Sequence, residues 1–192
     1  MKIAFVSDRP YPFFKGGAEK RYWEIARWLV EDGHEAQFYT GQWPGMARSM
    51  IIDGIKLRSV YEVGNFYVNG RKSVVESILY AVKLLPHLLA GSFDAIECDQ
   101  FPLLTIFTSK LVSVLKKKPL VVTWHEVWGK KQWVRYLGGL GMIGALIERL
   151  AVRLPDHIVS VSRRTTRNLS HVLGVRISRV STIPNGINMN WD

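Results

Sequence analysis

The chain has 192 residues, 47% of them hydrophobic, which is enough for one buried core and too short for two ordinary domains. Its 26 basic and 16 acidic residues give a formal charge of +10, which predicts attraction to nucleic acid, acidic phospholipid or phosphorylated small molecules. The single cysteine excludes an internal disulfide, and no apolar run reaches the roughly 20 residues of a membrane-spanning helix. We therefore expect one cytoplasmic domain without a signal peptide.

The first segment of the chain has the order strand, glycine turn, helix. An apolar run at 3–7 predicts a strand buried on both faces, and apolar residues from Ala18 to Val30 follow at helical spacing. Between them, Gly16 and Gly17 let the backbone approach a ligand closely, and the N-terminus of the helix attracts anions. The pair fits either a phosphate-binding turn or a plain connection between strand and helix.

The rest of the chain alternates between predicted strands and helices. Further strands are expected at 36–39, in a hairpin over 50–60 that turns at Asp53-Gly54, and at 94–98, 120–124, 157–161 and 180–183. Helices are expected over 103–115, 140–154 and 163–173, and over 74–85, where an apolar stripe that includes Val75 and Val82 predicts an amphipathic helix. This helix is expected to be interrupted near its end by Pro86 and stopped by Gly91. This alternation predicts a single Rossmann-like α/β domain, with a mostly parallel sheet of about seven strands and helices on both faces.

Residues that directly follow the predicted strands are the candidates for a site, because ligands bind beyond the carboxyl ends of strands in open parallel sheets. This rule selects Gly16, Gly17, Asp99, His125, Glu126 and Ser162. His125 follows a buried strand and has Trp124 and Trp128 as neighbours, which predicts a neutral hydrogen-bonding group or a general base. The sequence contains no zinc-ligand array, P-loop or Asp-X-Asp pair, so we expect an anion site that uses no metal.

Three basic segments, 116–118, 130–135 and 163–167, are candidates for contact with an anionic partner. In the second, Lys130, Lys131 and Arg135 accompany Trp133. Basic residues beside aromatic ones suit a membrane interface, where lysines meet anionic lipid. The alternative is that the basic residues are solvated helix ends and the aromatic residues pack into the core.

Taken in order, these segments resemble the N-terminal domain of glycosyltransferase family 4, whose members are retaining sugar transferases of GT-B architecture. The resemblance covers essentially the whole chain and rests on the ordered series rather than on one motif. The series is Gly16-Gly17-Ala18-Glu19, Asp53-Gly54, Phe93-Asp94-Ala95-Ile96, Val122-Thr123-Trp124-His125-Glu126, Val159-Ser160-Val161-Ser162 and Ile183-Pro184-Asn185-Gly186-Ile187. Where many members continue with Val-Asp after the Asn-Gly, this chain has Ile187-Asn188.

The resemblance implies that residues 1–183 form the acceptor-binding domain of such an enzyme. Residues 184–192, with Asn185 and Gly186 as a hinge, would begin the linker to a C-terminal nucleotide-sugar domain that is absent from this chain. Gly16 and Gly17, with Glu19 beside them, would contact substrate or its phosphate, and His125 would contact the sugar at the reaction centre.

The complete enzyme would then be a retaining hexosyltransferase. Its leaving diphosphate would be stabilised by charge, without a metal or another cofactor. Its substrates would be a nucleotide-diphospho-sugar and a sugar or lipid-linked acceptor, and the isolated chain would be inactive. Its basic segment predicts peripheral location at the cytoplasmic face of a membrane.

Two other functions fit parts of the sequence. A stand-alone, non-catalytic module that binds anions or a membrane accounts for the charge and for the turn-rich end of the chain. A nucleic-acid-binding protein accounts for the charge, yet the sequence shows no recognition helix or RNA-binding signature.

Overall fold

The computed structural model describes residues 1–68 and 70–186. The strands are β1 (Lys2–Val6), β2 (Glu35–Gln42), β3 (Ser49–Ile52), β4 (Ile55–Glu62), β5 (Tyr67–Val68), β6 (Arg71–Lys72), β7 (Ala95–Asp99), β8 (Leu120–Trp124), β9 (His157–Ser160) and β10 (Val180–Thr182). The α-helices are α1 (Gly17–Glu31), α2 (Val74–Ala90), α3 (Leu104–Lys116), α4 (Gly129–Leu137), α5 (Gly141–Ala151) and α6 (Arg163–Leu173). Two short 3-10 helices are η1 (Gly138–Leu140) and η2 (Ile177–Arg179).

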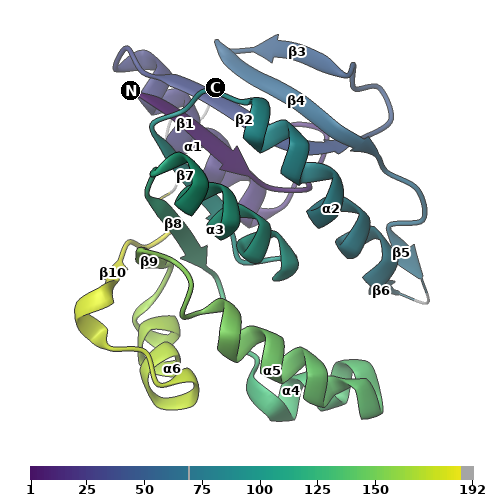
Figure 1. Cartoon of the computed structure of the whole chain (residues 1–192), viewed down its shortest axis with the longest axis vertical. Helices are drawn as coiled ribbons and strands as arrows, with labels where there is room; N and C mark the ends of the chain where they lie inside the picture. Colours follow the sequence, from purple (N-terminus) through teal and green to yellow (C-terminus); the bar gives the residue numbers. More distant parts are fainter. Residues whose placement is uncertain (69, 187–192) are drawn as a thin grey trace.

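Eight of these strands form one sheet in the order β10-β9-β8-β7-β1-β2-β4-β3, and β5 pairs with β6 in a separate hairpin (Figure 1). Strand β3 is antiparallel to β4, and the other neighbouring strands of the sheet are parallel. The predicted mostly parallel sheet is therefore confirmed, with eight strands in place of about seven.

The two faces of the sheet are covered unequally. Phe5 of β1 packs with Tyr22 and Trp23 of α1 in one core. Its neighbours Ala4 and Val6 point to the opposite face and belong to a larger core. Side chains of α2, α3, α4, α5 and α6 all contribute to that larger core. Helices thus cover both faces, as predicted, but α1 is the one helix that supplies the smaller core in the part of the chain that the structure describes.

Local signals placed the hairpin turn and the end of α2 at Gly91 correctly, but they predicted an interruption in that helix that is absent. Asp53 and Gly54 both have positive φ, 51° and 76°, as a two-residue hairpin turn requires. The predicted interruption at Pro86 is wrong, because α2 continues through it to Ala90. Pro86 and Val82, whose carbonyl loses its helical partner, both lie on the exposed side of α2, where water replaces the missing bond. Helix α4 and the β5–β6 hairpin were not predicted.

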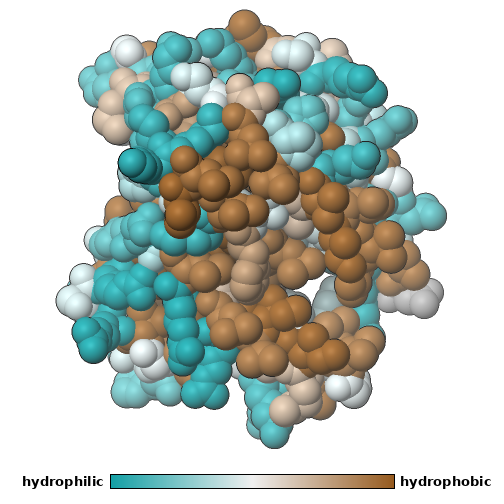
Figure 2. Space-filling model, viewed as in Figure 1, coloured by the Kyte–Doolittle hydropathy of each residue, from teal (hydrophilic) through white to brown (hydrophobic). Residues whose placement is uncertain are grey.

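Helix α2 is apolar on both sides. Its buried side carries Tyr80, Leu84 and Leu88, whereas the stripe that predicts an amphipathic helix, with Val75 and Val82, is exposed. Figure 2 shows that apolar residues form a continuous surface over α2, α3 and α5. Within the described residues, every helix is too short or too polar to cross a membrane.

Candidate functional site

Charged side chains from three strand ends and one hairpin meet at the carboxyl edge of the sheet. Asp8 and Arg9 follow β1, Asp99 ends β7, His125 follows β8, and Lys72 comes from β6. Lys72 forms an ion pair with Asp8, whose other oxygen lies 3.6 Å from Arg9 Nε. His125 Nε2 lies 3.6 Å from Asp99 Oδ1. We call these five residues the polar cluster; the sequence predicted Asp99 and His125 as members but not Asp8, Arg9 or Lys72.

The loop after β8 is fixed by partly buried hydrogen bonds. The backbone N–H groups of His125 and Glu126 donate to Gln100 Oε1 at 2.9 and 3.1 Å, and Gln100 Nε2 donates to the Glu126 carbonyl at 2.6 Å. Thr165 Oγ1 donates to the His125 carbonyl at 3.0 Å. Since Gln100 is fully buried, these bonds hold the backbone of His125 in one position. The Glu126 side chain is exposed.

The His125 ring is in a setting that keeps it neutral. Burial and the nearby Arg21 guanidinium lower the pKa of His125 to about 4, against the opposing effect of Glu19. The ring lies edge-on to Tyr22, with 6.1 Å between the ring centroids, and Nε2 has no hydrogen-bond partner among the described residues. A buried imidazole with so low a pKa is a weak general base, which favours the other option left by the sequence, a neutral hydrogen-bonding group.

The carboxyl of Asp99 is poised to hold or release a proton near neutral pH. Burial, with the charge of Asp8, raises the pKa of Asp99 to about 7, while Arg9 and Lys72 act in the opposite direction. Two carboxyls and two cations therefore share this edge of the sheet with a neutral imidazole. Such a set offers both donors and acceptors to the hydroxyl groups of a sugar.

The glycine turn holds a carboxylate of the chain itself. Gly16 is the N-cap of α1, and a Cβ added there would lie 2.0 Å from Glu19 Oε2, so only glycine lets the Glu19 side chain fold back over the turn. Glu19 Oε1 forms an ion pair with Arg9, 2.9 Å from its Nε. This ion pair positions Arg9, and contact of Glu19 with substrate or its phosphate stays a prediction. Gly17 faces open space, and anion binding there stays a prediction.

Two further predicted residues have structural contacts that explain their presence. Ser162 is the N-cap of α6 and accepts from the backbone N–H of Thr165 at 3.0 Å. Through Thr165 it is connected to the His125 carbonyl. Asn185 Oδ1 accepts from Arg21 at 3.2 Å, which ties this segment to α1. The predicted hinge at Asn185 and Gly186 stays untested, and Ile187-Asn188 lies outside the described residues.

A cavity of about 440 Å³ adjoins the polar cluster. Arg9 and Lys72 line it, and most of its other lining is apolar or aromatic. That lining includes Phe101, Leu104, Trp128, Trp133, Tyr136, Ile143 and Ile147. A cavity with apolar walls and a few charged groups is the usual form of a small-molecule site.

The aromatic wall of this cavity is held in place by one buried carboxylate. Glu148 of α5 accepts from the backbone N–H groups of Trp128 and Gly129 at 2.9 and 2.7 Å and from Trp133 Nε1 at 2.9 Å. Burial raises the pKa of Glu148, and these three donors oppose that rise. Trp133 is only 8% exposed, so the prediction that it contacts a membrane is wrong: its ring packs into the core and its N–H is bonded internally.

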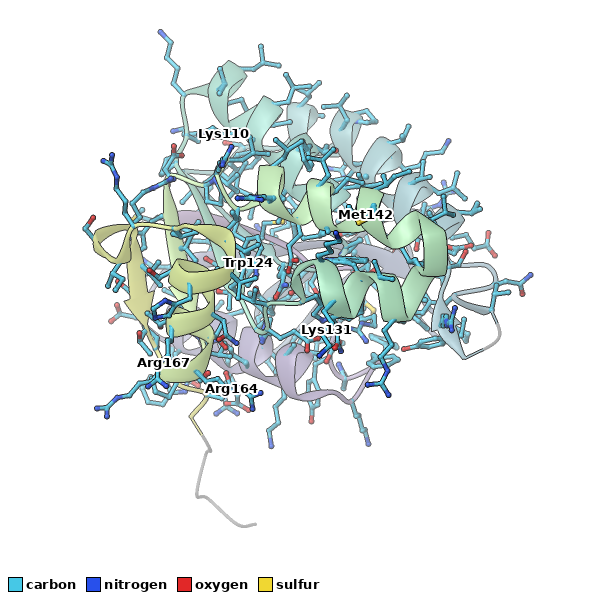
Figure 3. All side chains as sticks on the ribbon, turned by 90° about the horizontal axis from the view of Figure 1, so that it is seen from below. Lys110, Trp124, Lys131, Met142, Arg164 and Arg167 are labelled. Atoms are coloured by element: carbon cyan, nitrogen blue, oxygen red, sulfur yellow. The ribbon has the colours of Figure 1, made fainter. Side chains whose placement is uncertain are left out.

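The basic residues predicted to contact a membrane do lie at the surface. Lys130, Lys131 and Arg135 are exposed on α4. Figure 3 shows Lys131 on α4 and Met142 on the neighbouring α5, with Trp124 in the interior between the elements. Arg164 and Arg167 project from α6, apart from that helix pair. In the described part of the chain, no cluster of three or more His, Cys, Asp or Glu residues is arranged to hold a metal ion.

Comparison with known proteins gives one family and one architecture. Residues 15–191 match the sequence model of Glycosyltransferase Family 4. No curated protein sequence matches the chain significantly. Among solved structures, sucrose-phosphate synthase from Thermosynechococcus elongatus superposes with a TM-score of 0.71 at 13% identity, over 97% of this chain and 48% of the synthase.

Two other solved structures are similar. HepE from Anabaena, in complex with UDP and glucose, has a TM-score of 0.61 and 17% identity over 99% of this chain and 46% of HepE. A glycosyltransferase from Rickettsia africae has a TM-score of 0.61 and 15% identity over 97% of this chain and 43% of its own. The chain therefore spans less than half the length of these three structures.

Proposed function

This chain belongs to Glycosyltransferase Family 4, and we propose that it is the acceptor-binding half of an enzyme that transfers a sugar from a nucleotide-diphospho-sugar. The observation that carries this proposal is the polar cluster at the carboxyl edge of the sheet, directly beside the cavity. The match to less than half of each similar structure supports a division of labour with a second domain that holds the nucleotide.

Within this half, the neutral imidazole of His125 hydrogen-bonds a sugar hydroxyl at the reaction centre. The fixed backbone of His125 and its neutral ring at the carboxyl edge of the sheet support that role. Arg9 and Lys72 line the cavity and supply positive charge there for the anionic groups of the substrates. Transfer with retained anomeric configuration and without a metal is part of the proposal and rests on the family.

Binding of a sugar to the chain tests this proposal. We expect a two-dimensional NMR titration of the labelled 192-residue chain with a monomeric alkyl glucoside to shift the backbone signals of His125, Gln100 and Arg9. The variant His125→Ala is expected to weaken binding at least tenfold. His171→Ala is the matched control, since His171 is exposed on α6. Shifts confined to other parts of the chain, or equal losses in both variants, would contradict the proposal.

Catalysis needs the second domain, so the 192-residue chain by itself is expected to transfer no sugar. Incubation with a radiolabelled nucleotide sugar and an alkyl glucoside checks this, with glycoside product and released nucleotide as readouts. Turnover at an ordinary enzymatic rate would refute the need for a second domain.

We also propose that the complete enzyme works at the cytoplasmic face of a membrane, and exposed Lys130, Lys131 and Arg135 support this.

A further inference from the structure

The outward sides of α2, α3 and α5 carry large apolar residues that the fold leaves in solvent. Side chains exposed by between 55% and 64% include Val75, Val82, Val114, Leu115, Ile143 and Leu146. Helix α2 packs against α3, and α3 against α5, so the three exposed sides adjoin. Figure 2 shows them as one continuous apolar surface, which we call the apolar outer face. Soluble monomers rarely expose a surface of this kind without a partner.

The charges around the apolar outer face have one sign. Glu76 and Glu148 are the only acidic residues within α2, α3, α4 and α5, all of which the structure describes, and both are buried. The exposed charged residues of these helices are Lys83 on α2, Arg149 on α5, and Lys130, Lys131 and Arg135 on α4, where Figure 3 shows Lys131 on the side away from α5. A partner of this side of the molecule must therefore present apolar groups together with negative charge.

An anionic lipid leaflet meets both requirements. Two copies of this chain that met face to face would bring basic residues together without acidic partners. A nucleic acid would satisfy the charges but would not cover the aliphatic side chains. We infer that the apolar outer face seats the chain on an anionic phospholipid leaflet, with its aliphatic side chains among the acyl chains and the lysines and arginines at headgroup level.

The cavity beside the polar cluster leads from this face to the edge of the sheet. Ile143 belongs both to the apolar outer face and to the cavity wall, and Val74 and Leu104 line the same cavity. At its other end the cavity reaches Arg9 and Lys72. A hydrocarbon chain can therefore enter from the leaflet while its polar head lies at the polar cluster. This acceptor step rests on the proposed function and assigns an amphiphilic, lipid-borne acceptor. The membrane seat does not depend on sugar transfer.

Vesicle flotation tests the membrane seat. We expect the 192-residue chain to float with vesicles of phosphatidylcholine mixed with phosphatidylglycerol, and not with phosphatidylcholine alone, with less flotation in high salt. The triple variant V82E/L115E/L146E is expected to lose at least tenfold in binding with an unchanged circular dichroism spectrum. Ile177→Glu, at an equally exposed residue of η2, is the control and is expected to bind like the wild type.

Three outcomes would overturn the inference. These are no flotation with anionic vesicles, an equal loss of vesicle binding in the control Ile177→Glu, or a dimer in analytical ultracentrifugation that is monomeric in the triple variant.

The acceptor step is tested separately with Ile143→Trp, which narrows the cavity. This variant is expected to lose at least tenfold more affinity for a long-chain alkyl glucoside than for a short-chain one. Its flotation with vesicles is expected to stay unchanged. Equal losses of affinity for the two glucosides would refute the acceptor step. If His125→Ala left the affinity for both glucosides unchanged, the proposed function would be refuted instead.

Discussion

The polar cluster and the apolar outer face depart in opposite ways from the usual distribution of residues. At the carboxyl edge of the sheet, the carboxylates of Asp8 and Asp99 are buried, and the groups that pair with them are only partly exposed. On α2, α3 and α5, valines and leucines are exposed. Both arrangements cost folding free energy relative to an ordinary interior and surface. The difference teaches that the two regions respond differently to substitution: the first is rigid and costly to disturb, and the second is free to change.

The largest effect is expected for Asp8→Ala. This change leaves Lys72 without its carboxylate and removes one of the two acidic neighbours of Arg9, so we expect a loss of about 3–5 kcal/mol in the free energy of unfolding. Urea unfolding followed by circular dichroism measures it. Asp32→Ala is the control, because the Asp32 side chain is 82% exposed, and a change within about 0.5 kcal/mol is expected. If both variants lost the same free energy of unfolding, the polar cluster would not be more costly to disturb than the surface.

A smaller effect is expected from the titration of His125. Its pKa is about 4 in the fold and 6.5 in the reference state, so folding disfavours the charged form. The stability that depends on the neutral ring is complete above pH 6.5 and decreases as the pH falls toward 4, by up to about 3 kcal/mol. Asp99, with a raised pKa, has the opposite dependence between pH 4 and 7.

For this reason, the His125 contribution is measured as a difference between the wild type and His125→Gln across that pH range. The variant is expected to lose less stability than the wild type as the pH falls below 6.5. An NMR signal of the His125 ring that titrates near pH 6.5 would contradict the buried, neutral state.

The boundary of the polar cluster is tested by Ser162→Ala. Loss of the N-cap of α6 is expected to lower the free energy of unfolding by about 1 kcal/mol. The control Ser73→Ala, which removes the N-cap of α2, is expected to lower it by the same amount. Thermal unfolding compares the two variants. Sugar binding is expected to change equally little in both, and a selective loss in Ser162→Ala would place that hydroxyl in the site.

The smallest effect on stability is expected in the apolar outer face. The V82E/L115E/L146E variant is expected to change the free energy of unfolding by no more than about 0.5 kcal/mol per substitution, since all three side chains are more than half exposed. Urea unfolding in the absence of lipid checks this. A loss of several kcal/mol would show that these residues pack within the fold and would end the comparison between the two regions.

Most of the fold follows from local patterns in the sequence, whereas half of the site does not. Buried strands such as 120–124 and the Asp53-Gly54 turn have local signals and are confirmed. Asp99 and His125 were predicted because they follow strands, and the structure places them 3.6 Å apart. Lys72 comes from a hairpin 64 residues after Asp8, and its pairing has no local signal.

Two further differences between the predicted and the observed helices have a physical cause in tertiary context. The stripe with Val75 and Val82 predicted an amphipathic α2 correctly in its spacing, but the buried side is the one with Tyr80 and Leu84. Periodicity cannot identify the buried side of a helix that is apolar on both. Helix α4 was not predicted, because Glu148, nearly 20 residues later in the chain, binds the N–H groups at its start.

The three hydrogen bonds of Glu148 also make the segment 128–151 a transferable unit. They join α4 to α5 within the segment itself, so the part of the aromatic wall formed by Trp128, Trp133 and Tyr136 has its own internal support. Exchange of this segment between related chains would then change the width of the cavity and the acceptors that fit it. The sheet that holds His125 would stay the same.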